Sequence, residues 1–129
     1  MKLLLMVTAV LEAAAGLALL VMPSLAVSIL LGVPLETPAS LVAGRIAGTA
    51  LVALAVACWQ TKDGERGAST GVVEAMLLYN FAGAVVLAYA AIRLELRSRL
   101  LWPAIVFHLG LGIWCGLNLW ITRRKLSRS

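Results

Sequence analysis

The chain contains four apolar runs, each long enough to cross a lipid bilayer. They cover approximately residues 3–22, 39–60, 70–92 and 100–121. A helix needs about 20 apolar residues to cross the hydrocarbon core, so runs of this length are typical of transmembrane segments. Because the four runs occupy most of the 129 residues, no soluble domain of useful size remains. We therefore predict a single integral membrane domain.

The composition and the pattern within the runs indicate the fold class. Hydrophobic residues make up 62% of the chain and charged residues only 13%, whereas about a quarter of the residues of a soluble domain are charged. Only helices and closed barrels satisfy every backbone polar group inside lipid. The runs lack the two-residue alternation of barrel strands. The sequence thus predicts an all-α fold, a four-helix bundle in the membrane.

Two segments near the first run allow more than one interpretation. The chain begins with a lysine and an apolar run that ends in small residues, as a cleaved signal peptide does. Glu12 beside the cleavage position and the apolar residues that follow favour an uncleaved first span. After Pro23, the segment SLAVSILLGVP is too short to cross the membrane. It either extends the first helix past a kink or lies at the interface. Thr37 and Pro38 then predict a helix start.

Basic residues concentrate on one side of the predicted spans. That side holds seven of them: Lys2, Lys62, Arg66, Arg123, Arg124, Lys125 and Arg128. The other side holds three: Arg93, Arg97 and Arg99. Lys and Arg are enriched in cytoplasmic loops, so this bias predicts a bacterial-type inner-membrane protein with both termini in the cytoplasm. Topology also explains the net charge of +5, and we expect no binding to nucleic acid.

Each predicted span carries a strongly polar residue well inside its ends. These are Glu12, Arg45, Asn80 and His108. Three of them fall near mid-depth, whereas Arg45 is the seventh residue of its span, about 10 Å below the surface at 1.5 Å per residue. Its side chain either extends outward to the interface or points into the bundle. Charged groups inside a membrane usually face the bundle interior and pair with one another.

Helical spacing places small or weakly polar residues beside these four side chains. Thr8 shares a helix face with Glu12, Thr49 with Arg45, and Cys115 with His108. Small residues on such faces permit close helix approach. The simplest geometry puts all four polar groups at one level, and we predict that Glu12 pairs with Arg45, within reach of Asn80 and His108.

This predicted cluster has a structural and a functional interpretation. In the structural one, an ion pair and hydrogen bonds fix which helices pack together. In the functional one, the cluster binds a small apolar ligand, a quinone head group or a proton, because ionisable groups inside membranes are candidates for functional sites. The leading hypothesis is a non-enzymatic accessory or partner-binding subunit. The alternative is a proton-coupled transporter or channel that uses Glu12, and an enzyme acting on lipid or quinone comes third.

The sequence offers no metal or cofactor site of recognisable pattern. Cys58 and Cys115 are not in a CxxC arrangement, and we expect buried free thiols. Together with His108 they make at most a three-residue set, with Cys58 near the inner end of its span. The GxxxG pairs at Gly44–Gly48 and Gly112–Gly116 fit close helix contacts, within the chain, in a homo-oligomer or in a larger membrane complex.

Two segments resemble those of a known family. They are LEAAAGLALLVMPS, a Gly-containing first helix that ends near Pro23, and GRIAGTALVAL, an arginine followed by small residues. In these segments the chain resembles the DoxX-like group of small four-helix bacterial membrane proteins. The resemblance covers about half of the chain. It implies the four-helix fold and an accessory role beside membrane redox enzymes, and it transfers no catalytic residue.

Overall fold

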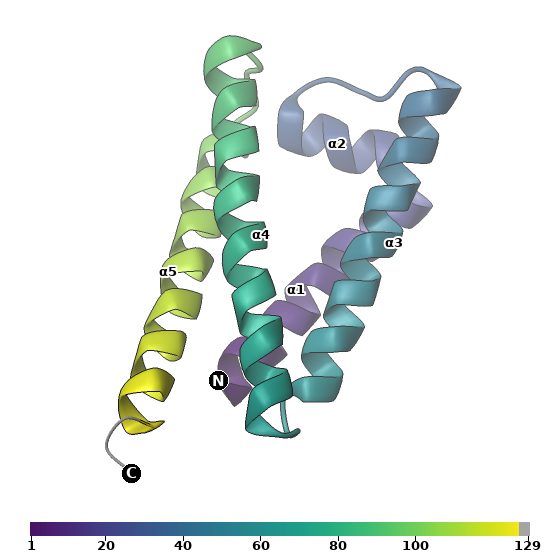
Figure 1. The fold of residues 1–129 in the computed structure, drawn as a ribbon. Helices are drawn as coiled ribbons and strands as arrows, with labels where there is room; N and C mark the ends of the chain where they lie inside the picture. The colour runs from purple at the N-terminus through teal and green to yellow at the C-terminus, as the bar shows by residue number, and fades with distance from the viewer. Residues whose placement is uncertain (127–129) are drawn as a thin grey trace.

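A computed structural model describes residues 1–126, and within that range the chain forms five α-helices and no strand. The helices are α1 (Lys2–Val21), α2 (Pro23–Leu31), α3 (Pro38–Thr61), α4 (Arg66–Arg93) and α5 (Leu101–Leu126) (Figure 1). All except α2 are long and apolar enough to cross a membrane. The predicted all-α fold with four membrane spans is confirmed, and the chain is a multi-pass membrane protein. Arg128, which was included in the charge count above, lies outside the described residues.

The helices extend furthest beyond the predicted apolar runs at the start of α4 and at the end of α5. Helix α4 begins at Arg66 rather than at residue 70, and α5 continues to residue 126 rather than 121. The apolar runs mark only the hydrocarbon core, whereas helical hydrogen bonding continues into the polar flanks. The last turn of α5 carries three basic residues, Arg123, Arg124 and Lys125. Their charges interact favourably with the negative end of the helix dipole.

The segment after the first span forms a helix of its own. The backbone leaves helical geometry at Met22, and Pro23 begins α2, which lies crosswise to α1 and α3 (Figure 1). Gly32, in the left-handed conformation with φ 83°, ends it. The Ser98 hydroxyl group donates a hydrogen bond of 2.7 Å to the Ile29 carbonyl oxygen, and this bond ties α2 to the loop before α5. The segment after Pro23 was predicted either to extend the first helix past a kink or to lie at the interface. Because α2 is a separate helix that crosses α1, the structure excludes the extension.

Helix α3 begins where the sequence predicts. The Thr37 hydroxyl group accepts a hydrogen bond from the backbone N–H of Ser40 at 3.1 Å, and the Ser40 hydroxyl group lies 3.1 Å from the backbone nitrogen of Thr37, whose N–H it accepts. This reciprocal capping box satisfies two backbone donors that a helix start leaves open. Pro38 occupies the first helical turn, where its missing N–H costs nothing.

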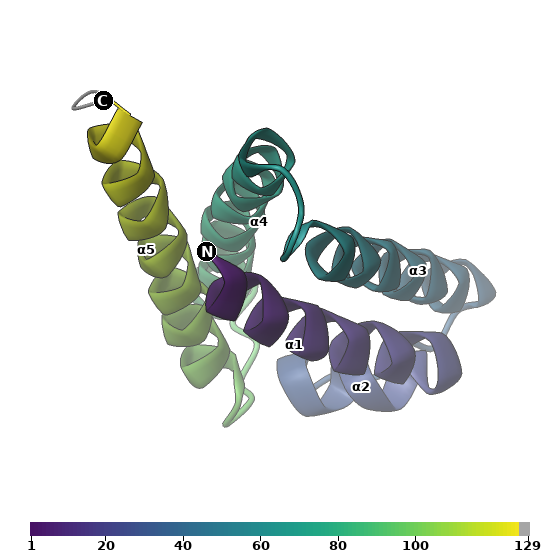
Figure 2. The same cartoon turned by 90° about the horizontal axis from the view of Figure 1, so that it is seen from below.

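The four long helices are arranged as two antiparallel pairs. Packing is most extensive between α1 and α3 and between α4 and α5, and it is sparse between the pairs. The pairs meet near the start of α1 and diverge toward the other end, where α2 lies (Figures 1 and 2). The long helices of the two pairs are therefore joined at one end, and at the other end α2 connects the pairs through the hydrogen bond between Ser98 and Ile29.

A buried core cluster lies at the joined end. It combines the start of α1, the end of α3, the start of α4 and the end of α5, so it draws on both pairs. Its members are Leu4, Leu5, Ala9, Cys58, Val73, Met76, Cys115 and Leu119. At the same end, the Lys2 ammonium group lies 2.6 Å from a carboxylate oxygen of Asp63 in the α3–α4 loop. The hydrogen bond from Lys2 keeps the pKa of Asp63 below its ordinary value, so this contact includes an ionised carboxylate at neutral pH.

Two glycines set the register of the first pair. A Cβ atom placed on Gly48 would lie 2.7 Å from the carbonyl oxygen of Gly16 and 2.9 Å from the backbone nitrogen of Leu20. A Cβ atom on Gly16 would lie 2.8 Å from the carbonyl oxygen of Gly48 and 2.9 Å from the backbone nitrogen of Val52. Because these neighbours are backbone atoms, they cannot move aside as a side chain can. Backbone therefore packs directly on backbone at this crossing, as small residues permit in membrane helices.

We expect Gly48→Ala to destabilise the protein, because the added methyl group displaces α1. The free energy of unfolding should fall by about 1–3 kcal/mol, the usual cost of overpacking. The measurement is unfolding of detergent-solubilised protein by a denaturing detergent, followed by circular dichroism.

The matched control is Gly110→Ala in α5, where a Cβ atom meets nothing within 4 Å. Removing backbone freedom there should leave the stability unchanged or raise it by up to about 1 kcal/mol. Equal effects of the two substitutions would contradict the proposed close contact.

Candidate functional site

The second helix pair carries a buried hydrogen bond between two of the predicted polar residues. The His108 Nδ1 atom on α5 lies 3.0 Å from the Asn80 Oδ1 atom on α4, and Asn80 is fully buried. The Asn80 amide nitrogen donates to the backbone carbonyl oxygen of Met76 at 2.8 Å, so Oδ1 is the atom that accepts. His108 therefore donates from Nδ1, which leaves Nε2 as the acceptor atom of a neutral imidazole.

A glycine on α4 makes room for the imidazole ring. A Cβ atom on Gly83 would lie 3.4 Å from the Cε1 and Nδ1 atoms of His108, so the ring packs flush against the backbone one turn after Asn80. A similar contact occurs nearby, where a Cβ atom on Gly112 would lie 3.2 Å from the Phe81 ring. Ring-on-glycine packing from both helices thus brings α4 and α5 close enough for the Asn80–His108 hydrogen bond.

The predicted glutamate lies where α1 meets the second pair. Glu12 is only 5% exposed, and the polar side chain that acts on its carboxyl group is that of Tyr79 on α4. The Tyr79 ring in turn makes an edge contact with the His108 ring, with 5.8 Å between the ring centroids and an angle of 71° between the planes. Tyr79 thus contacts Glu12 on one side and His108 on the other.

We call Glu12, Tyr79, Asn80 and His108 the polar cluster. Its members come from α1, α4 and α5, so it spans the sparse junction between the two helix pairs. Of the four residues predicted to come together, Asn80 and His108 contact each other directly, and Tyr79 lies between His108 and Glu12. Among the described residues, no fully buried side-chain nitrogen or oxygen atom lacks a hydrogen-bond partner, as burial in a low-dielectric interior requires.

Arg45 is not part of the polar cluster, and the predicted Glu12–Arg45 pair is wrong. Arg45 is exposed, and no ion pair among the described residues joins it to Glu12. The register of the first pair is the physical reason. Gly16 contacts residues 48–52 and Gly48 contacts residues 16–20, so in this antiparallel pair Glu12 lies level with residues beyond Val52.

Arg45 consequently lies toward the other end of α3, separated from Glu12 along the helix axis by roughly 10 Å or more at 1.5 Å per residue. Of the two orientations considered for its side chain, the structure excludes the one that points into the bundle. An exposed arginine near a span end extends its charged head toward the interface.

The secondary residues take different positions. Thr8 is buried on α1, one turn from Glu12. Thr49 is exposed and its hydroxyl group donates to the backbone carbonyl oxygen of Arg45 at 3.0 Å, so it has no part in the polar cluster. Cys115 and Cys58 are buried with free thiols and belong to the core cluster at the joined end. In the part of the chain that the structure describes, no three His, Cys, Asp or Glu side chains are placed to hold a metal ion.

Tyr79 is the cluster member that the sequence analysis missed. Tyrosine is common at membrane interfaces and in apolar helix faces, so its type alone did not distinguish it. Two features could have identified it. It directly precedes Asn80, and it lies in the middle of an apolar span, where a hydroxyl group needs a hydrogen-bond partner.

No protein-family model, curated protein or solved structure matches the chain. The resemblance to the DoxX-like group therefore stays a prediction, and the site has to be interpreted from its own geometry.

The geometry predicts which polar residues are energetically coupled. A double-mutant cycle of Asn80→Leu and His108→Leu should give a coupling energy on the order of 0.5–2 kcal/mol, the range of hydrogen bonds between membrane helices. A cycle of Glu12→Gln and Arg45→Met should give about zero, within roughly 0.5 kcal/mol, as for distant sites. The measurement is the free energy of unfolding in detergent for each single and double variant.

The second cycle serves as the control for the first. A large coupling between Glu12 and Arg45 would contradict the register of α1 against α3. No coupling between Asn80 and His108 would contradict the hydrogen bond between α4 and α5.

Proposed function

We propose that the protein is a non-enzymatic membrane protein that binds and releases a proton at Glu12, and that it couples this exchange to movement of a small molecule. The observation that carries the proposal is the environment of Glu12. Its side chain is buried, the polar side chain that acts on it is the uncharged one of Tyr79, and no ion pair of the described residues includes it.

The absence of that ion pair distinguishes two of the functional hypotheses. A permanent pair with arginine would hold the carboxyl group in its ionised form. Without a counter-ion, a carboxylate inside the hydrocarbon region is costly, whereas the neutral acid can exchange its proton with neighbouring groups. Tyr79 and His108 are such neighbours, since a phenol and an imidazole both donate and accept hydrogen bonds.

The position of Glu12 suggests how proton exchange changes the structure. Glu12 on α1 and Tyr79 on α4 belong to different helix pairs, and packing between the pairs is sparse. A change in the charge of Glu12 alters one of the few polar contacts between them. Proton binding would thereby shift the angle between the pairs, which is the type of rigid-body movement that membrane transporters use.

The proposed location follows from the charged residues at the helix ends. Lys2 begins α1, Lys62 follows α3, Arg66 begins α4, and Arg123, Arg124 and Lys125 end α5. These six lie at the joined end. At the other end, Arg93 ends α4, and Arg97 and Arg99 lie in the loop between α4 and α5. By the positive-inside rule, we propose a bacterial-type inner membrane with the joined end and both termini in the cytoplasm.

A second candidate is an accessory subunit that binds a partner protein. The resemblance to the DoxX-like group implies the same role. In that case Glu12 is a structural hydrogen-bonding residue and keeps one protonation state.

Infrared difference spectroscopy during a pH titration in lipid nanodiscs tests the proposal. We expect a carboxyl C=O band that appears and disappears with pH in the wild type and is lost completely in Glu12→Gln. Tyr79→Phe should keep the band but move it to higher frequency, because the carboxyl group loses a hydrogen-bond donor.

The matched control is Glu74→Gln. Glu74 is an exposed glutamate on α4 that pairs with Arg123 at 2.9 Å, and its removal should leave the band in place. If no band depends on Glu12 at any pH, Glu12 does not exchange a proton and the accessory-subunit function is favoured instead.

A further inference from the structure

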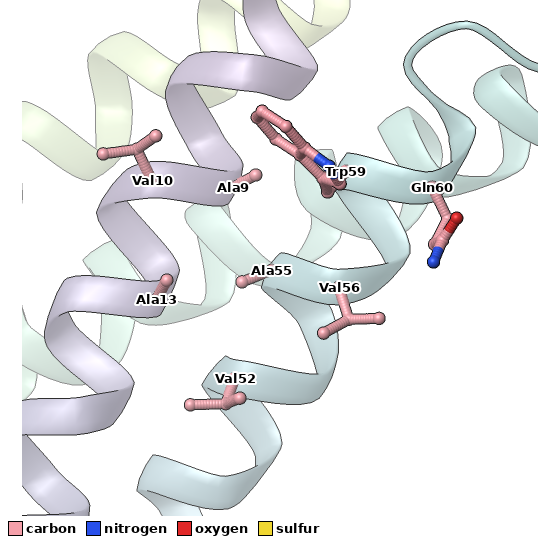
Figure 3. A pocket seen from close by; sticks show the side chains of 8 residues that line it. All are labelled: Ala9, Val10, Ala13, Val52, Ala55, Val56, Trp59 and Gln60. Atoms are coloured by element: carbon pink, nitrogen blue, oxygen red, sulfur yellow. The ribbon is translucent and has the colours of Figure 1, made fainter.

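A groove of about 340 Å³ lies between α1 and α3. Three alanines, Ala9, Ala13 and Ala55, leave the space open, and valines form its borders (Figure 3). The lining residues are Ala9, Val10, Ala13, Val52, Ala55, Val56, Trp59 and Gln60. Between residues 52 and 60 of α3 the groove extends about 12 Å along the helix at 1.5 Å per residue.

The groove has a chemical gradient along its length. Its walls are aliphatic as far as Val56, and its end is formed by the indole ring of Trp59 and the amide of Gln60. The Trp59 ring lies beside Ala9 across the groove (Figure 3). Trp residues mark the level of lipid head groups, so the aliphatic part lies at acyl-chain depth and the polar end at head-group depth.

Positive charge lies at the polar end. The Lys62 ammonium group lies 4.0 Å from the centroid of the Trp59 ring, directly beside a residue that lines the groove. Lys62 and Lys2 share one carboxylate, that of Asp63, at 3.4 Å and 2.6 Å. Two ammonium groups against one carboxylate leave one positive charge in excess at this end.

We propose that this groove binds an anionic phospholipid, with one acyl chain along the alanines and the phosphate group at Lys62. An acyl chain matches an aliphatic groove between two helices, and basic residues beside membrane helices attract anionic head groups. A groove of this length is shorter than a transmembrane helix, so it fits a lipid chain better than a second copy of this chain. The proposal is independent of proton binding at Glu12, since no polar-cluster residue lines the groove.

Native mass spectrometry of the full chain, released from detergent with added lipid, tests the proposal. The probes are phosphatidylglycerol and phosphatidylcholine with identical acyl chains. We expect the wild type to prefer phosphatidylglycerol about fivefold, the effect of one basic side chain near an anionic surface. Lys62→Gln should abolish this preference, and Asp63→Asn should increase it because it releases two ammonium groups.

A second pair of variants tests the groove itself. Ala13→Leu fills the groove and should reduce binding of both lipids severalfold. Ala14→Leu, at an exposed neighbour that does not line the groove, should bind both lipids as the wild type does. Lys125→Gln, at the same end of the molecule on α5, should keep the preference for phosphatidylglycerol.

Three results would overturn the proposal. One is equal binding of the two lipids by the wild type. Another is a preference for phosphatidylglycerol that remains in Lys62→Gln. Because Lys62 lies outside the helix core, this variant is informative even if Ala13→Leu fails to fold. The third is a dimer in the same spectra that Ala13→Leu abolishes while lipid binding stays unchanged, which would assign the groove to a second copy.

Discussion

The arrangement of polar side chains in this molecule depends on the direct backbone contact between Gly16 and Gly48. This contact fixes the register of α1 against α3, and the register decides which side chains meet. Glu12 comes to lie at the junction with α4, and Arg45 comes to lie near the other end of its helix. In a bilayer, burial of apolar surface does not drive helices together, so close contact between small residues carries this role. One pair of glycines thus separates two opposite charges that would otherwise be natural partners.

The consequence for Glu12 is a neutral neighbour instead of a cation. Tyr79 reaches Glu12 from α4, and the same ring contacts His108, which is bound to Asn80. Three helices therefore meet through one chain of polar side chains. Such a chain is more sensitive to protonation than an ion pair would be, because a carboxyl group, a phenol and an imidazole can each act as donor or acceptor. The interpretation of Glu12 as a proton-binding residue depends on this difference.

The sequence alone was sufficient to predict the four membrane spans and part of the polar cluster. The apolar runs identified all four long helices, because the thickness of a bilayer dictates their length. Depth within a span also indicated correctly that Asn80 and His108 could meet, since both lie near the middle of adjacent antiparallel helices. The same argument failed for Arg45 because depth counted from a helix end ignores register and tilt, which depend on where two backbones cross. Tyr79 was missed because its ring resembles any other apolar residue until its hydroxyl partner is known.

Because the two helix pairs diverge, the angle between them depends on the thickness of the surrounding bilayer. Helix α1 has 20 residues and α4 has 28, so the first pair contains the shortest membrane-length helix and also leans away from the second. A tilted helix spans less thickness than an upright one, and helices adjust their tilt to match the local hydrocarbon core. In a thicker membrane the first pair has to stand more upright, and the angle between the pairs decreases. Membrane thickness therefore acts mainly on the α2 end, where the hydrogen bond between Ser98 and Ile29 links the two pairs, while the core cluster stays in place.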